Sequence, residues 1–230
     1  MRYLSSLVFL LCCVSLSWAQ IDCHPFVPTD TGTKWEVTDY SPKGKVLGRT
    51  TFELIDKIVD GENVTFKVAT TYYDKKDKES FKHEFEAYCK GGIFEFDMSY
   101  RMNGGTMQAY QNMDLEVDAT SFTVPDLDAK AGSSLPDGSL AVSVGSGGVN
   151  MFKMKVDITD RKLEARESLT TPAGTFPCVI LSQTVTTKMI MKVQASSKEW
   201  YSEGVGMVRS ESYNKKGKLT GYSELTKLDK

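Results

Sequence analysis

Histidine is scarce in this sequence of 230 residues, and the side chains that could act as nucleophiles, proton donors or metal ligands are not spaced as known sites require. His24 and His83 are the only histidines, and neither a His-x-x-x-His nor a Cys-x-x-Cys pair occurs, so the common zinc patterns lack support. No Gly-x-Ser-x-Gly element stands between a strand and a helix to position a serine nucleophile. The sequence therefore predicts no catalytic residue, no metal ligand and no cofactor.

Carboxylates are the abundant reactive group, with 30 aspartates and glutamates in the chain. Asp126, Asp128 and Asp137 could hold a calcium ion together with backbone carbonyls, although ordinary loop composition explains them better. A pair of carboxylates on the wet face of a sheet could hydrolyse a glycan or a peptide. An extracellular hydrolase is therefore the alternative function, but so many acidic residues always offer some pair.

Methionine is the one compositional excess, with 10 residues that fall mostly into three groups. Because methionine is flexible and polarizable, such groups either fill a core or line a plastic apolar cavity. A copper(I) thioether site ranks third, because histidine is so scarce. The cavity hypothesis makes the segment from Met102 to Met113 a lid over an apolar or amphipathic ligand. Its candidate ligand-binding residues are these methionines and nearby aromatic residues, namely Met98, Met102, Met107, Tyr110, Met113, Met151, Met154, Trp200 and Tyr201.

Three cysteines, Cys23, Cys89 and Cys178, follow the N-terminal apolar segment. In an oxidising compartment an odd number favours one disulfide and one spare thiol. Cys89 and Cys178 lie in strand patterns with apolar neighbours, whereas Cys23 lies in a tail, so Cys89 and Cys178 are the disulfide candidates. Three unpaired, buried cysteines are about as consistent with the sequence.

The elements that must position these residues are β-strands, because apolar and polar side chains alternate with a period of two along most of the chain. The alternation is clear over residues 64–72, 81–90, 94–101 and 152–158. One apolar and one wet face are typical of an antiparallel sheet that covers a single core. We expect an all-β fold with a strongly curved sheet that forms a barrel, half-barrel or sandwich, with at most one short helix in the central insertion from Met102 to Asp114.

Glycine-containing turns separate the strand patterns, as tight hairpins require. Three turn segments resemble one another, since each has a tyrosine followed by a basic stretch, at residues 40–45, 73–78 and 213–218. We interpret them as hairpins of one design. Residues 125–137 read as a loop, and the three glycines in residues 144–149 as a flexible turn or bulge.

The first 19 residues have the three parts of a signal peptide. Arg2 gives the positive region and residues 4–16 the apolar region. Ser17 and Ala19 place small residues at the −3 and −1 positions, so that cleavage is expected between Ala19 and Gln20. A lipid anchor is not expected, because no nearby cysteine has a small residue directly before it. The mature chain would then be one β domain over residues 20–230 without a transmembrane segment, in the periplasm or at the surface of a Gram-negative cell.

The charge balance is mildly acidic, with a net charge of −2. This argues against a nucleic acid and against an anionic membrane as partner, since both need a concentrated basic face. The expected function is non-catalytic: binding of a lipid or other apolar small molecule, or of an envelope protein partner, through a β sheet.

Two sequence elements resemble a known family. Thr171-Pro-Ala-Gly-Thr-Phe-Pro-Cys178 and Trp200-Tyr-Ser-Glu-Gly-Val-Gly206 are similar, in order and spacing, to elements of exported bacterial β proteins, most of which are domains of unknown function. With Gly32-Thr-Lys-Trp-Glu36, they resemble the Bacteroidales branch called TapB-like. The resemblance is strongest over about residues 165–225, reaches back to about residue 30, and implies an exported β fold and no activity.

Physically, the two elements serve folding first and binding second. Pro172-Ala173-Gly174 is typical of a tight turn, after which Phe176 would enter the core. The two glycines at 204 and 206 would let another chain or a large ring approach closely, with Trp200 and Tyr201 packed nearby.

Overall fold

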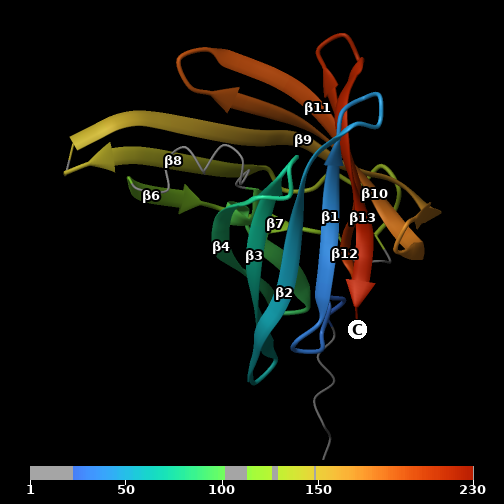
Figure 1. Ribbon diagram of the computed structural model, residues 1–230. Coiled ribbons are helices and arrows are strands. Elements are labelled where there is room, and N and C mark those ends of the chain that lie inside the picture. Colours follow the sequence, from blue (N-terminus) through green and yellow to red (C-terminus); the bar gives the residue numbers. More distant parts are fainter. Residues whose placement is uncertain (1–22, 102–112, 126–128, 148, 230) are drawn as a thin grey trace, which may run out of the picture.

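The computed structural model describes residues 23–101, 113–125, 129–147 and 149–229 (Figure 1). Within them the chain forms strands and one short 3-10 helix, and no helix there is long and apolar enough to cross a membrane. The predicted signal peptide and residues 102–112 lie outside the described residues. The elements are β1 (Lys34–Tyr40), β2 (Val46–Asp60), β3 (Asn63–Asp74), β4 (Glu79–Lys90), β5 (Ile93–Asp97), η1 (Met98–Arg101), β6 (Asp114–Ala119), β7 (Ser121–Thr123), β8 (Gly138–Ser146), β9 (Val149–Thr171), β10 (Gly174–Lys188), β11 (Lys192–Ser202), β12 (Gly206–Asn214) and β13 (Leu219–Asp229).

All strands belong to one antiparallel sheet in the order β6-β8-β9-β10-β11-β12-β13-β1-β2-β3-β4-β5-β7. Its two outermost strands, β6 and β7, are consecutive in the chain, and only Thr120 separates them. The Thr120 N–H donates to Ser139 O at 2.9 Å, and Thr120 O accepts from the Met98 N–H at 3.3 Å. The sheet therefore curls back toward itself through this corner. The predicted all-β, antiparallel, strongly curved fold is confirmed, in its barrel-shaped form.

Large aromatic side chains fill the inside of the sheet. Neighbouring rings lie 4.6–6.3 Å apart, in mostly tilted or edge-on pairs. Each such buried side chain contributes about 1.5–3 kcal/mol to stability as an upper estimate. The cavity left among them has a volume of about 40 Å³, so this part of the interior is a packed core. The rings belong to Phe26, Phe85, Phe94, Phe96, Tyr100, Phe122 and Tyr201.

Arg161 lies inside the barrel although its side chain is charged, and its residue is 1% exposed. Its two terminal nitrogens donate to Pro136 O and Thr123 O, both at 2.6 Å. The guanidinium also lies 3.6 Å from the centre of the Phe122 ring, a cation–π contact. Arg161 therefore ties β9 to the end of β7 and to the loop before β8, near the corner that brings the sheet round.

The three hairpins predicted to share one design do share it. In each turn a polar side chain accepts a hydrogen bond from the backbone N–H four residues later, and the residue before that donor has a positive φ. These acceptors occupy the position directly after β1 and the last positions of β3 and β12. The polar acceptors are Ser41, Asp74 and Asn214, and the residues with positive φ are Gly44, Asp77 and Gly217.

Candidate functional site

The N-terminal segment, residues 23–30, packs against one end of the barrel. Phe26 and Val27 are each only 1% exposed, because their side chains complete the core. The Phe26 ring lies 5.8 Å from that of Phe94 and 6.3 Å from that of Tyr201, measured between ring centres. The Gly204 N–H, in the turn between β11 and β12, donates to Pro25 O at 2.8 Å. The segment is therefore an integral part of the fold.

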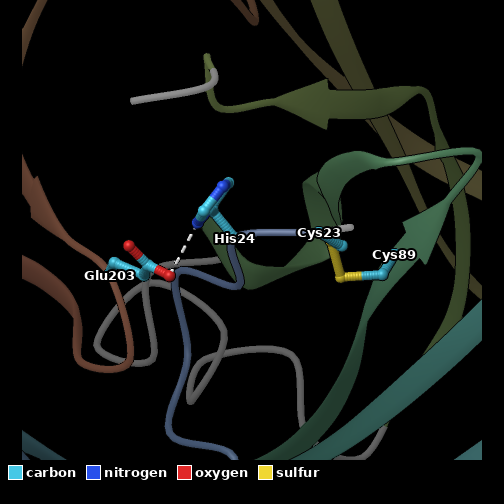
Figure 2. Close-up of a disulfide and its surroundings, with 4 residues drawn as sticks. All are labelled: Cys23, His24, Cys89 and Glu203. Carbon is cyan, nitrogen blue, oxygen red and sulfur yellow. Dashed lines mark hydrogen bonds and ion pairs between the residues drawn. A yellow bond between two sulfur atoms is a disulfide. The ribbon is translucent and has the colours of Figure 1, made fainter. Parts of the chain in front are cut away.

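A disulfide between Cys23 and Cys89 joins this segment to β4 (Figure 2). The prediction of Cys178 as the partner of Cys89 is wrong: Cys178 is a free, buried thiol. Cys178 lies on β10, which is seven places from β4 in the sheet order, and adjacent strands lie about 5 Å apart. The tail, which the sequence pattern left unassigned, folds back across the barrel and brings Cys23 to Cys89.

The glycines of the second sequence element make room for the N-terminal segment. Gly206 has a φ of +107°, and a Cβ atom there would lie 3.1 Å from Phe26 O. Val205 between the two glycines is buried. The predicted close approach is thus made by the protein's own N-terminal segment.

Trp200 and Tyr201 are both buried, but they point to opposite faces of β11 because neighbouring strand residues alternate. Tyr201 enters the core. Trp200 lies on the other face, where its Nε1–H donates to Glu167 Oε1 at 2.6 Å. The two residues, which were predicted to pack together near the glycines, therefore lie on opposite faces of the sheet.

A groove lies where the N-terminal segment, the start of β10 and the β11–β12 turn meet. Its volume is about 710 Å³, in the range of small-molecule sites. Both sequence elements contribute to it, the first through Pro177 and Cys178 and the second through Ser202 to Gly204. The lining residues are Pro25, Thr29, Arg166, Glu167, Ser168, Pro177, Cys178, Val179, Ser202, Glu203 and Gly204.

The charged side chains of the groove have defined partners. Arg166 donates to Ala129 O at 2.6 Å, and Glu167 accepts from Trp200. Glu203 Oε1 lies 2.8 Å from His24 Nδ1, directly beside the disulfide (Figure 2). These contacts fix the positions of the charges around the groove before any ligand arrives.

Cys178 is unsuited to nucleophilic attack. Burial, followed by the nearby Glu167 carboxylate, raises the pKa of its thiol to about 12. The thiol donates to Phe176 O at 3.4 Å. Because the thiolate is the reactive form, Cys178 is unreactive at neutral pH.

The predicted ligand-binding methionines lie in different environments. Met98 is fully buried and Met154 packs against the core, whereas Met151 is 62% and Met113 36% exposed. Met102, Met107 and Tyr110 lie outside the described residues. The structure does not bring the described members together around one cavity, and none of them lines the groove.

A buried polar network, which the sequence patterns did not reveal, crosses β10 and β11. Gln183 Nε2 donates to Glu199 Oε1 at 2.8 Å and to Ser197 Oγ at 3.0 Å. The Tyr201 hydroxyl donates to Glu199 Oε2 at 3.0 Å, and it lies 2.7 Å from the Tyr100 hydroxyl. The alternating pattern places Gln183 and Glu199 on the inner face, and this was the available signal.

No group of three or more histidines, cysteines or carboxylates that could hold a metal ion occurs among the described residues.

Comparison with known proteins gives a family and a fold. A family model described as DUF3108-like matches residues 30–225. A Bacteroides fragilis protein, described provisionally as exported and with a YmcC-like fold, is 23% identical, with a TM-score of 0.80 over 90% of this chain and 100% of that one. A Parabacteroides distasonis protein, described provisionally as a lipoprotein, is also 23% identical, with a TM-score of 0.80 over 90% of this chain and 99% of that one. No curated protein matches the chain.

Proposed function

This chain belongs to the DUF3108-like family, and on that premise we propose that it is a non-catalytic envelope protein that binds an amphipathic ligand in the groove beside its N-terminal segment. The observation that carries the proposal is the convergence of both sequence elements and the disulfide-bonded segment on one groove of about 710 Å³. The provisional descriptions of the two structural neighbours as exported and as a lipoprotein support the envelope. The spacing of the two sequence elements supports a place in the TapB-like branch, and the signal peptide supports the periplasm or the surface of a Gram-negative cell.

The chemistry of the groove suits a ligand with an apolar body and a polar end. Pro25, Pro177 and Val179 offer apolar surface. Arg166 places a positive charge beside them, and Ser168 adds a hydroxyl. Pockets with mostly apolar walls and a few fixed polar groups are typical of binding sites for small amphiphiles.

The filled interior favours the groove over the inside of the barrel as the binding place. The cavity among the core aromatic residues is about 40 Å³, far below the volume of about 300–1,000 Å³ that is typical of ligand pockets. A fatty acyl chain needs several times that volume, which the groove, at about 710 Å³, offers.

The groove also bears on the hydrolase alternative, because it contains two carboxylates, Glu167 and Glu203. Each carboxylate already has a partner, Trp200 in one case and His24 in the other. A proton donor and a nucleophile need opposite protonation behaviour, and fixed partners of this kind favour a structural role for both. Binding is the better supported function.

The test is binding of a fluorescent, dansylated fatty acid to the purified protein and to two variants. Ser168→Trp fills the groove, and Ser212→Trp places the same side chain at an exposed position on β12. We expect S168W to weaken binding about tenfold or more, since loss of apolar contact area of this size is worth at least 1.4 kcal/mol, and S212W to leave the Kd unchanged. Absence of binding, or equal binding by S168W, would refute the ligand proposal.

The same preparation tests the hydrolase. The wild-type protein is incubated with a panel of glycans and peptides, and product release is followed for the wild type, Glu167→Gln and Glu203→Gln. Release that one of these substitutions abolishes, in a protein with an unchanged melting temperature, would replace the binding function by hydrolysis.

A further inference from the structure

Lysines collect at the end of the barrel opposite the groove. The three hairpins of common design, defined here as the basic rim (residues 41–45, 74–78 and 214–218), all turn at this end and join strands that are neighbours in the sheet, in the order β12-β13-β1-β2-β3-β4. Their lysine side chains are all exposed. These are Lys43, Lys45, Lys75, Lys76, Lys78, Lys215, Lys216 and Lys218.

The positive charge of the basic rim is largely uncompensated. None of its eight lysines forms an ion pair with another described residue. The rim contains two acids, and both are occupied: Asp77 pairs with Arg49 at 2.7 Å, and Asp74 accepts from the backbone N–H groups of Lys76 and Lys78. Such a surface attracts anions through its whole field.

An apolar tip stands next to the basic rim. It is the turn between β10 and β11, where Met189, Ile190 and Met191 are 47%, 100% and 75% exposed. Lys188 and Lys192 flank these three residues directly. Since β11 pairs with β12, this tip neighbours the β12–β13 hairpin of the basic rim. Figure 1 shows the tip projecting from the upper part of the barrel.

The long β8–β9 hairpin extends the apolar surface. Val149 and Met151 near its tip are 66% and 62% exposed. In Figure 1 the β8–β9 hairpin projects to the left and the β10–β11 hairpin to the upper left. The nearest acidic run, Asp114, Glu116 and Asp118, lies on β6, which β8 and β9 separate from β10. Closer to the tip, Asp157 on β9 pairs with Lys188 at 3.2 Å and with Lys155 at 2.7 Å. These three groups together leave one positive charge beside the tip, and Lys192 adds a second.

We propose that this end of the barrel docks onto an anionic lipid surface, with the Met189–Met191 tip in the interface and the lysines of the basic rim against the phosphates. Scattered apolar residues on a surface need no explanation, but three consecutive ones at the tip of a projecting hairpin do. Lysine can extend its charged head to the phosphates while its stem remains in the apolar layer. Apolar side chains framed by lysines are the composition of segments that lie in membrane interfaces.

The net charge of the chain argued against an anionic membrane as partner. A net charge does not show where on the surface the charged side chains lie. The end opposite the rim carries both signs: Asp60 at the end of β2, Glu62, Glu203 and Asp229 are accompanied there by Lys34, Lys57 and Lys90. The lysines of the basic rim are therefore a local concentration of positive charge at one end of the barrel. Such a molecule approaches a negative surface with the lysine-rich end first, whatever its total charge.

The test is co-sedimentation of the purified protein with phosphatidylcholine vesicles that contain none or about 30% phosphatidylglycerol. We expect binding to the anionic vesicles and little to the neutral ones. Raising the salt from about 0.1 M to about 0.5 M should weaken binding strongly, because it screens exposed charges. Equal sedimentation with both kinds of vesicle, or with neither, would overturn the proposal.

Variants locate the surface. Lys215→Gln, Lys216→Gln and Lys218→Gln together should lower the partition coefficient about 100-fold, because each lysine near an anionic surface contributes about a factor of five. The matched control is the triple change Lys130→Gln, Lys162→Gln and Lys198→Gln, which removes the same charge from exposed positions outside the rim and should weaken binding much less. Equal losses in both triple variants would refute a local surface.

A further pair of variants separates the tip from the groove. Ile190→Ser with Met191→Ser keeps every charge and should weaken binding to anionic vesicles at least tenfold, since it removes the apolar side chains that enter the interface. S168W, which fills the groove, should bind vesicles as the wild type does. A tip variant that binds like the wild type, with an unchanged melting temperature, would contradict insertion.

Discussion

The bond between Cys23 Sγ and Cys89 Sγ joins two positions that are 66 residues apart in the chain. It ties the first described residue of the protein to β4, a strand whose inner face carries Phe85 and Ala87. Directly after Cys23, the chain places His24 beside Glu203 and then buries Phe26 and Val27. The disulfide therefore holds closed the end of the barrel where the groove lies.

Removal of this disulfide by Cys23→Ser with Cys89→Ser should destabilise the protein by about 4 kcal/mol, because the bond closes a loop of 66 residues and loop-closure entropy of that size restricts the unfolded chain. Urea unfolding with and without reductant measures the effect. Cys178→Ser is the control: Cys178 is free, so this variant keeps the disulfide, and reductant should destabilise it as much as it destabilises the wild type. An equal midpoint for oxidised and reduced wild type would contradict the prediction.

Gly206→Ala should loosen the N-terminal segment. The substitution combines a positive φ of +107° with a Cβ only 3.1 Å from Phe26 O. Gly132→Ala is matched for the backbone strain, because Gly132 has a φ of +87° and nothing within 4 Å of the added Cβ. Strain of this kind costs about 1–3 kcal/mol, so G206A should lose more stability than G132A.

Hydrogen exchange locates the excess loss in G206A. The amides of residues 23–30 should exchange faster in G206A than in G132A, because only the first substitution disturbs the contact with Phe26. Identical exchange of this segment in the two variants would mean that Gly206 serves the turn alone.

The strands and turns could be predicted because their signals are local. The alternation in β3 places Val64, Phe66 and Val68 in the core, and the two-residue connection at Pro172 and Ala173 joins β9 to β10 as expected. Both depend on neighbours in the chain, which a single sequence displays.

The disulfide and the groove could not be predicted, because they depend on which distant segments meet. Cys23 lies in a stretch without periodicity, and only the closed barrel brings it to Cys89. The same holds for Arg161, whose partners Pro136 and Thr123 belong to segments well before it in the chain. A residue pattern shows which face a side chain takes, and tertiary closure decides what it meets there.

Asp39→Asn tests how stability depends on pH at Asp39, which lies near the end of β1 beside the basic rim. Burial raises the pKa of the Asp39 carboxyl above its usual 3.8, and the hydrogen bond from Ser223 opposes this shift. Between 3.8 and the raised pKa the folded protein holds a proton that the unfolded chain has lost, so the stability contributed by this group falls as pH rises through that interval.

The amide in D39N can still accept from Ser223 and carries no charge. We expect D39N to lose this pH dependence and to be at least as stable as the wild type at pH 7, as measured by urea unfolding across the acidic range. Asp56→Asn, at an exposed position on β2, is the control and should keep the wild-type dependence on pH. A lower free energy of unfolding for D39N than for the wild type at pH 7 would instead show that the Asp39 carboxylate has a favourable partner.

Tyr201→Phe should weaken the network inside the barrel while the ring remains in place. The Tyr201 hydroxyl lies 2.7 Å from that of Tyr100 and donates to Glu199 at 3.0 Å. Its loss leaves buried oxygens short of a partner, which costs about 1–3 kcal/mol. Tyr213→Phe is the matched control, because the Tyr213 hydroxyl donates to Glu211 on a half-exposed face, and it should cost about 1 kcal/mol or less.

A double-mutant cycle with Tyr100→Phe isolates the contact between the two tyrosines. Urea midpoints of Y201F, Y100F and the double variant give the coupling free energy, which should be about 0.5–3 kcal/mol for groups in one buried network. Independent, additive losses would mean that the two hydroxyls are held by other partners and only happen to be close. A coupling of the expected size would identify Tyr100, two residues before the central insertion, as the residue that ties η1 to β11.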